Sequence, residues 1–248
     1  EPRPGVTSAR NRVLAEASGT DLLAFIDDDE IPHEDWLARL VATYLGDPDA
    51  DAVAGPVYPV FDADLDPLVQ ASGIYGLPHR SHLRTGERVR RAGSGNLLLD
   101  LRTVRRLGIT FDDRFGLTGG EDSFFTGQLT KAGARIVWCA EAVADHRVPL
   151  TRANRGYTLQ RRLSLSNAGV RADVLLADPG PERIGVRLRW LVICLGSAVK
   201  GGLGVVVGRL GRSSATTATG EIRVMSALGG IAGALGAAAK PYQRPADS

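Results

Sequence analysis

The chain has 248 residues, of which 44% are hydrophobic and 23% are charged, and its formal net charge at pH 7 is +2. This composition is typical of a globular protein with a sizeable core and excludes a disordered chain. The two cysteines, Cys139 and Cys194, are too few for a disulfide framework, which favours a reducing, cytoplasmic setting.

The first 150 residues alternate between apolar runs and amphipathic segments, a pattern that predicts an α/β sandwich. In chain order, the predicted elements are a helix over 7–17, a strand over 22–27, a helix over 34–45, a strand over 52–61, a strand over 95–100, a helix over 101–107, a helix over 121–132, a strand over 134–140 and extended chain over 142–148. Residues 62–92 are polar and basic, which predicts a long loop with a short helix, an insertion of the kind that carries substrate contacts.

Beyond residue 150 the sequence becomes helical and basic. The pattern predicts a helix over 151–169, a linker over 178–181, an apolar glycine-rich segment over 184–208, a helix of small residues over 221–239 and a polar end over 240–248. Residues 1–150 carry 16 Lys and Arg and 23 Asp and Glu, whereas residues 151–248 carry 14 and 5. We therefore expect a catalytic domain over 1–150 and a basic C-terminal region over 151–248.

The basic region suggests a partner with negative charge. It lacks interleaved aromatic residues, so we expect an anionic membrane surface and no nucleic acid, with chance surface variation as the alternative. The apolar stretch from Trp190 to Gly208 is just long enough to cross a bilayer, but Lys200 lies near its centre, where a charge is costly. An interfacial or core-packed helix is therefore favoured over a true span.

Three adjacent carboxylates, Asp27, Asp28 and Asp29, directly follow the apolar run Leu22–Ile26. A buried strand that ends in acids carries them to the rim of a sheet, where open α/β sheets bind nucleotides and metals. Because adjacent carboxylates repel one another, a hard cation among them is stabilising. The triplet predicts Mn²⁺ or Mg²⁺ held against a diphosphate, and the alternative is a solvated acidic turn before the next helix.

A second acidic group follows a glycine pair in Gly119-Gly120-Glu121-Asp122. The glycines permit a tight turn, and the acids fall in the first turn of a helix near its positive end. Ordinary N-terminal helix charge is the alternative reading. The apolar residues on both sides, including Phe124 and Phe125, favour a carboxylate that acts as a general base.

Weaker signals lie in two small-residue or polar segments and in one histidine. The residues before the third strand are small enough for a ligand to approach the backbone, and Asn96 can donate and accept hydrogen bonds. Arg10 and Asn11 lie near a helix start, where phosphate contacts are possible. His146 follows an extended segment and would complete a metal site if it lay beside Asp29.

Taken together, these motifs resemble family 2 glycosyltransferases in their order and spacing. The matching segments are Ala9-Arg10-Asn11, Phe25-Ile26-Asp27-Asp28-Asp29, Gly93-Ser94-Gly95-Asn96 and Gly119-Gly120-Glu121-Asp122. The phrases IDDDEIP and FGLTGGED are most similar to bacterial exopolysaccharide transferases of the succinoglycan type. The resemblance covers roughly residues 5–150 and implies a GT-A-type mixed sheet flanked by helices, with a C-terminal helical appendage.

The resemblance also implies roles for individual residues. Asp122 is implied as the catalytic base with Glu121 supporting it, and Asp29 as the direct metal ligand. The implied metal ligands are Asp29, Asp27 and His146; the implied nucleotide-binding residues are Arg10, Asn11, Asp27 and Asp28; and the implied sugar or acceptor residues are Gly93, Ser94, Gly95, Asn96 and Gly120. The family normally has a further nucleotide-binding strand and helix before its acidic motif, so we expect the fold to be incomplete at the N-terminus, in a fragment that opens with Glu1.

The implied function is an inverting, metal-dependent transfer of a sugar from a UDP-linked donor to a saccharide or lipid-linked acceptor in polysaccharide synthesis. A peripheral location on the inner face of the cell membrane would suit such an acceptor. Two alternatives stay open at this point, a sugar nucleotidyltransferase and a non-catalytic membrane-associated subunit. The transferase hypothesis requires that the acidic triplet and the Glu121–Asp122 pair lie close together.

Overall fold

The computed structural model describes residues 1–62, 64–75 and 82–239. The chain forms two compact units. The first, called here the α/β unit, comprises Glu1–Val60, Tyr75–Gly116 and Glu121–Val148. The second, called the helical unit, comprises Phe61–Ile74, Leu117–Gly120 and Pro149–Ser248.

The α/β unit contains a mixed five-stranded sheet in the order β1-β6-β3-β7-β5. Its strands are β1 (Leu22–Ile26), β3 (Ala52–Ala54), β5 (Arg88–Val89), β6 (Asn96–Asp100) and β7 (Ile136–Trp138). Strands β3 and β7 are parallel, and the other neighbours are antiparallel. The register of the β1–β6 pair sets Ile26 opposite Asn96, so the end of β1 lies beside the start of β6.

A second sheet of three strands follows the order β2-β8-β4, with β2 (Glu30–Pro32), β4 (Val57–Val60) and β8 (Ala144–Arg147). Strand β2 pairs antiparallel with β8, and β4 pairs parallel with β8. In this register Glu30 is the partner of His146. The acidic triplet therefore lies between β1 and a strand, β2, that is held by its pairing with β8.

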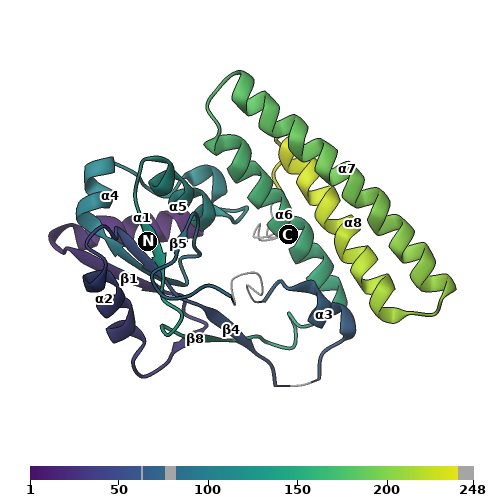
Figure 1. The fold of residues 1–248 in the computed structure, drawn as a ribbon, viewed down its shortest axis with the longest axis horizontal. Coiled ribbons are helices and arrows are strands. Elements are labelled where there is room, and N and C mark those ends of the chain that lie inside the picture. Colours follow the sequence, from purple (N-terminus) through teal and green to yellow (C-terminus); the bar gives the residue numbers. More distant parts are fainter. Residues whose placement is uncertain (63, 76–81, 240–248) are drawn as a thin grey trace. The chain divides into compact units, whose positions relative to one another are not determined.

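Helices cover both faces of the five-stranded sheet (Figure 1). The helical segments of this unit are α1 (Val6–Glu16), η1 (Ala17–Gly19), α2 (Trp36–Gly46), α4 (Leu101–Leu107), η3 (Asp113–Phe115) and α5 (Glu121–Lys131). On β6, Leu97 and Leu99 pack on one side with residues of α4 and α5, whereas Leu98 packs on the other side with α2. The alternation follows from the two-residue period of a strand, and it makes β6 buried on both faces.

The helical unit consists of α3 (Pro67–Ser72), α6 (Arg155–Leu176), α7 (Pro181–Leu210) and α8 (Ser214–Ala234). Helices α7 and α8 run side by side in opposite directions after a short turn (Figure 1). Glycines allow the close approach, because a Cβ atom on Gly220 would lie 2.6 Å from the backbone nitrogen of Val205. A Cβ on Gly229 would lie 2.1 Å from the carbonyl oxygen of Leu163, so α8 also lies tightly against α6.

The predicted α/β class with a mixed sheet, flanking helices and a C-terminal helical region is confirmed. The predicted strand over 52–61 is divided, because Gly55 and Pro56 separate β3 from β4, which belong to different sheets. The predicted short helix in 62–92 is α3. The short strands β2 and β5 have too few residues to show a periodic pattern and were not predicted.

In the helical unit, the predicted boundaries differ more from the observed ones. The helix predicted over 221–239 begins earlier, at Ser214, where the side chain of Ser213 accepts a hydrogen bond from the backbone of Thr216, and it ends at Ala234. Helix α6 begins later than predicted and continues to Leu176. The predicted polar end over 240–248 and part of the predicted loop, 76–81, lie outside the described residues.

Candidate active site

The acidic triplet lies in the turn between β1 and β2. The backbone nitrogen of Glu30 donates to the carbonyl oxygen of Asp27 at 3.1 Å, which closes the turn. The side chains of Asp27 and Asp29 are about half-exposed, and Asp28 is exposed. The triplet therefore lies at the rim of the sheet, as predicted from the apolar run before it.

Arg10 of α1 joins this turn to the start of α5. Its Nη2 lies 3.1 Å from Oδ1 of Asp27, and its Nη1 donates to Oε1 of Glu121. The guanidinium also lies over the ring of Phe111, 5.7 Å from the ring centre. One buried cation thus brings together two acidic groups that are about ninety residues apart in the sequence.

Glu121 and Arg10 are both almost buried, with side-chain exposures of 8% and 11%. Burial, assisted by the neighbouring charge of Asp122, raises the pKa of Glu121, although Arg10 opposes this shift. Burial by itself would lower the pKa of Arg10, but the charges of Glu121 and Asp27 outweigh it and raise that pKa. The second oxygen of Glu121, Oε2, is buried with no hydrogen-bond partner among the described residues.

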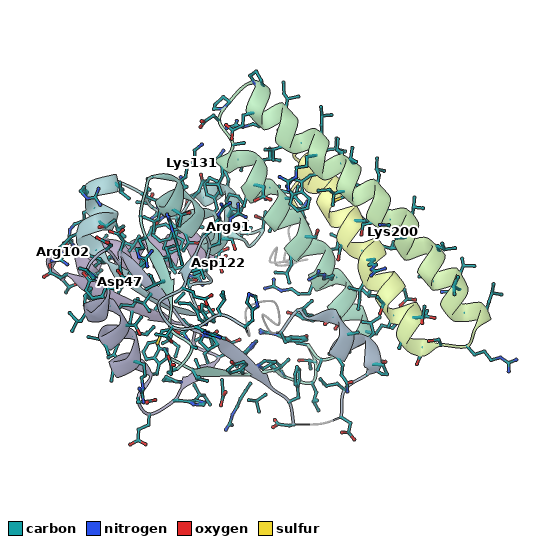
Figure 2. All side chains as sticks on the ribbon, in the orientation of Figure 1. Asp47, Arg91, Arg102, Asp122, Lys131 and Lys200 are labelled. Carbon is teal, nitrogen blue, oxygen red and sulfur yellow. The ribbon has the colours of Figure 1, made fainter. Side chains whose placement is uncertain are left out.

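Asp122, labelled in Figure 2, occupies the first turn of α5 and lies close to Gly93 in the segment that precedes β6. Its Oδ1 accepts a hydrogen bond from the backbone nitrogen of Ser123 at 2.5 Å. Its Oδ2 lies 3.4 Å from the position that a Cβ on Gly93 would take. Thr126 ties α5 to the segment before β6, because its hydroxyl accepts a hydrogen bond from the backbone nitrogen of Ala92 and donates one to its carbonyl oxygen.

The residues around Gly93 are used in different ways. Ser94 is buried, and its hydroxyl has no partner among the described residues. A Cβ on Gly95 would lie 2.4 Å from Oε1 of Glu30, so a side chain there would displace the carboxylate of Glu30. Asn96 accepts a hydrogen bond from Nε1 of Trp36 and donates to the carbonyl oxygens of Pro56 and Ala142, so its amide is used inside the fold.

Two other predicted site residues also make internal contacts. The amide of Asn11 exchanges two hydrogen bonds of 2.8 Å with the backbone of Phe111, which fixes α1 and with it Arg10. Gly120 has a φ of +87° that glycine adopts readily, and a Cβ there would lie 2.8 Å from Cβ of Ala168. These contacts explain the residue types without any ligand.

Glu30 is a residue of this site that the motif analysis missed. Its carboxylate accepts a hydrogen bond from the backbone nitrogen of Asp27 at 3.2 Å. Burial, together with the charges of Asp27 and Asp29, raises the pKa of Glu30 to about 8 despite that hydrogen bond. The signal in the sequence was that Glu30 directly follows the triplet as a fourth consecutive acid. It is the first residue of β2, and its side chain lies against Gly95.

His146 lies beside Asp29 because β2 pairs with β8. Its Nε2 is 3.3 Å from Oδ2 of Asp29, and this nitrogen is buried without a well-aligned hydrogen bond. A carboxylate oxygen is a ligand that suits Mn²⁺, and an imidazole nitrogen is a common ligand of divalent transition metals. Asp27, the third predicted ligand, is instead paired with Arg10.

Among the described residues, no group of three or more His, Cys, Asp and Glu side chains is arranged to hold a metal ion. The pair of Asp29 and His146 therefore offers two protein ligands at most. A divalent cation bound by so few protein groups needs further oxygen ligands from a bound phosphate and water. The donor set fits a metal that enters together with a diphosphate.

Residues 1–97 match the sequence profile described as Glycosyl transferase family 2. The succinoglycan biosynthesis protein ExoM of Rhizobium meliloti (strain 1021) is 32% identical over 200 residues, which cover 79% of this chain and 60% of ExoM. The O-antigen chain rhamnosyltransferase RfbN of Salmonella typhimurium (strain LT2) is 23% identical over 141 residues, covering 55% of this chain and 44% of RfbN. This chain thus spans less than two thirds of either relative.

The chain is also similar to an archaeal transferase over a short segment and to a solved structure at low identity. The glucosyl-dolichyl phosphate glucuronosyltransferase of Haloferax volcanii is 44% identical over 55 residues, or 22% of this chain and 17% of that protein. A crystal structure of GalNAc-T7 with UDP, GalNAc and Mn²⁺ superposes with a TM-score of 0.45 at 17% identity, covering 69% of this chain and 35% of that one. The resemblance inferred from the motifs is confirmed: residues 1–97 match the family 2 profile, and the chain is similar to ExoM over 200 residues.

Proposed function

We propose that this chain is the catalytic part of an inverting, metal-dependent glycosyltransferase. It transfers a sugar from a UDP-linked donor to a saccharide or lipid-linked acceptor in polysaccharide synthesis. The observation that carries the proposal is the Arg10 bridge, which holds the acidic turn after β1 next to the α5 start that bears Asp122. Donor phosphates and an acceptor hydroxyl would then meet within one compact unit.

Asp122 is proposed as the general base. One oxygen is fixed by the backbone nitrogen of Ser123, while the other faces the space left by the missing side chain of Gly93. An acceptor hydroxyl in that space gives its proton to Oδ2 as its oxygen attacks the anomeric carbon, and the bond to the donor phosphate breaks on the opposite face. A single displacement of this kind inverts the anomeric centre, whereas retaining glycosidases use a second carboxylate as a nucleophile.

Asp29 and His146 are proposed to hold the metal, with Mn²⁺ favoured over Mg²⁺ because an imidazole nitrogen is one of the ligands. When bound, the ion supplies positive charge to the departing diphosphate. Arg10 is proposed to position the acidic turn and α5, since both of its carboxylate contacts are made within the fold. Glu121 then acts through Arg10 and is a positioning residue.

The acceptor is proposed to be linked to a lipid, and the site of action to be the cytoplasmic face of a membrane. The Haloferax volcanii relative is a glucosyl-dolichyl phosphate glucuronosyltransferase by name, and dolichyl phosphate is a lipid phosphate. The region 151–248, with 14 basic and 5 acidic residues, carries the charge expected of a protein at an anionic surface.

The test of the base is Asp122→Asn in the full chain. We expect the release of UDP from UDP-glucose or UDP-galactose, with a polyprenyl diphosphate-linked sugar as acceptor and Mn²⁺ present, to fall by roughly a hundredfold or more, since general-base catalysis contributes about 10²–10⁴. Calorimetry with UDP and Mn²⁺ should show affinity within about twofold of the parent, because the donor contacts stay intact.

Asp49→Asn is the matched control, because Asp49 is an exposed acid in the turn after α2 and lies outside the candidate site. It should change neither turnover nor binding. Transfer by the Asp122→Asn variant within a few-fold of the parent would rule out this base. Absence of any UDP binding by the parent would instead favour the non-catalytic alternative.

Removal of the metal tests the second part of the proposal. We expect EDTA to abolish UDP binding and transfer, and Mn²⁺ to restore both. His146→Ala should need at least about tenfold more Mn²⁺ for half-maximal UDP binding, because one of two protein ligands is lost. An unchanged Mn²⁺ requirement in this variant would exclude His146 as a ligand.

A further inference from the structure

Helix α7 carries a continuous apolar stripe on the side that faces away from α8. Its members recur every three or four residues, which keeps them on one face of the helix. The stripe, called here the α7 stripe, consists of Leu188, Val192, Leu195, Val199, Leu203 and Val206. Each of these side chains is between 54% and 72% exposed. An exposed apolar patch of this length indicates a surface that a membrane or another molecule covers.

The opposite face of α7 already has its partner. Gly201 and Gly208 are buried against α8, where a Cβ on Gly208 would lie 2.5 Å from Oγ1 of Thr217. Cys194 is buried on the same side, close to Gly230. The packing of the helical unit therefore uses the small residues of α7 and leaves its large apolar residues exposed.

Basic residues lie along both edges of the stripe. At 3.6 residues per turn, Arg189 and Lys200 fall on one edge, and Arg209 falls on the other. Figure 2 labels Lys200 on α7, about two thirds of the way along the helix from Pro181. A long cationic side chain beside apolar residues can extend its charge toward phosphate groups while its stem stays in an apolar layer.

This arrangement favours a helix that lies in the plane of a membrane over one that crosses it. By length and composition α7 qualifies as a candidate span, the one such helix in the described part of the chain. A crossing would place Lys200 near the bilayer centre and would also draw in α8, whose Glu221 is paired with Arg155. An in-plane position avoids both costs, because only the stripe enters the acyl boundary.

A second copy of the chain fits the stripe less well. Two α7 helices packed stripe to stripe would bring their basic edges together, and like charges in contact are unfavourable. Anionic lipid headgroups supply the opposite charge along both edges at once. The region 151–248 adds to this attraction with its excess of basic over acidic residues.

We infer that α7 is an in-plane membrane anchor, with the α7 stripe inserted at the acyl boundary of an anionic lipid surface and its edge arginines and lysine on the lipid phosphates. The inference deepens the membrane location in the proposed function and rests on it. Its test measures vesicle binding alone, so that loss of sugar transfer and loss of membrane docking are observed separately.

The experiment is co-flotation of the full chain with vesicles of 70% phosphatidylcholine and 30% phosphatidylglycerol, compared with pure phosphatidylcholine. We expect binding at least roughly tenfold tighter to the anionic vesicles, because the negative potential of such a surface attracts basic residues close to it. The stripe variant Val192→Asn with Val199→Asn should weaken binding by roughly tenfold or more. Leu45→Asn, an equally exposed apolar residue on α2, is the matched control and should have no effect.

A charge variant, Arg189→Gln with Lys200→Gln, keeps the test decisive if the stripe variant loses its helical circular dichroism. It should lose the preference for anionic vesicles. Vesicle binding by either folded variant within twofold of the parent would overturn the inference. So would a concentration-dependent dimer in the absence of lipid that the stripe variant abolishes, because the stripe would then bind a second copy.

Depth measurements separate the in-plane anchor from a span. Both native cysteines, Cys139 and Cys194, are buried, so a fluorophore can be attached selectively at Leu188→Cys, Leu195→Cys or Val206→Cys. Quenching by spin-labelled lipids should report the same shallow depth at all three positions. A deep central position between two shallow ends would show a crossing helix and overturn the inference.

Discussion

Arg10 is the residue on which the geometry of the candidate site depends most. A buried charge is tolerated when it is paired, and Arg10 has carboxylates on two sides and an aromatic ring beneath it. Asn11 holds the same turn of α1 in place through the backbone of Phe111. Arg10 and Asn11 of the family-like segment Ala9-Arg10-Asn11 therefore make their contacts within the protein.

We expect Arg10→Gln to lower the free energy of unfolding by about 3 kcal/mol, because it leaves Glu121 as an unpaired buried charge. The double variant Arg10→Gln with Glu121→Gln should lose less than the sum of its two single variants. Urea unfolding of the four proteins measures this coupling. Arg12→Gln is the matched control on the same helix, since its pair with Glu16 is exposed, and it should cost less than about 0.5 kcal/mol. Additive losses would contradict the bridge.

Asp100 offers a pH-dependent test of stability at the other end of β6. Its side chain is 10% exposed, and burial alone would raise its pKa, but hydrogen bonds from Arg102 and Tyr44 lower the pKa to about 2. Because this value lies below that of the unfolded chain, the stabilisation is complete above about pH 4 and is lost as the pH falls toward 2.

Asp100→Asn should therefore reduce the free energy of unfolding by about 1 kcal/mol at pH 7, a value discounted because Arg102 is more than half exposed. The difference between variant and parent should shrink between pH 4 and pH 2.5 in urea titrations. A difference that stays constant over this range would show that the carboxylate charge contributes nothing.

At the scale of elements, the short strands position the candidate metal ligands. Strand β2 is three residues long, yet its antiparallel pairing with β8 brings His146 to within 3.3 Å of Asp29. A slip of one residue in this pairing would turn His146 to the opposite face of the sheet. The candidate metal pair is thus a consequence of strand register.

Glycines set the packing of α8 against its neighbours, and one of them can be compared with a glycine on α7 that makes no such contact. Gly229→Ala should destabilise the helical unit by roughly 2 kcal/mol, because its Cβ would meet the carbonyl oxygen of Leu163 at 2.1 Å. Gly196→Ala on α7 has no atom within 4 Å of its Cβ and should stabilise the helix by about 0.5–1 kcal/mol. Thermal unfolding followed by circular dichroism measures both. Equal effects would contradict the packing argument.

At the scale of the whole molecule, charge and chemistry are divided along the chain. The net charge is −7 over residues 1–150 and +9 over residues 151–248, and the near-neutral total conceals this division. The acidic part contains the candidate active site, and the basic part contains the α7 stripe. The proposed function needs both, because a nucleotide sugar binds through a cation and a lipid-linked acceptor lies at an anionic surface.

The sequence by itself determined the α/β class, most helices of the α/β unit, the acidic rim and the family resemblance. These features depend on local or periodic patterns. An apolar run predicts a strand, the residue type predicts a helix cap, and the spacing of residues identifies a motif. The same local rules placed the start of α8 too late, because glycine and threonine before residue 221 have weak helix preference and packing against α6 and α7 overrides it.

Only the tertiary structure decided that Arg10 joins Asp27 to Glu121, that His146 lies beside Asp29, and that Glu30 is buried with its pKa raised to about 8. It also decided which face of α7 packs on α8 and which face remains exposed. Each of these depends on contacts between residues far apart in the chain. Burial and charge pairing depend on which distant residues come into contact in the folded chain. The periodicity of a single segment does not contain that information.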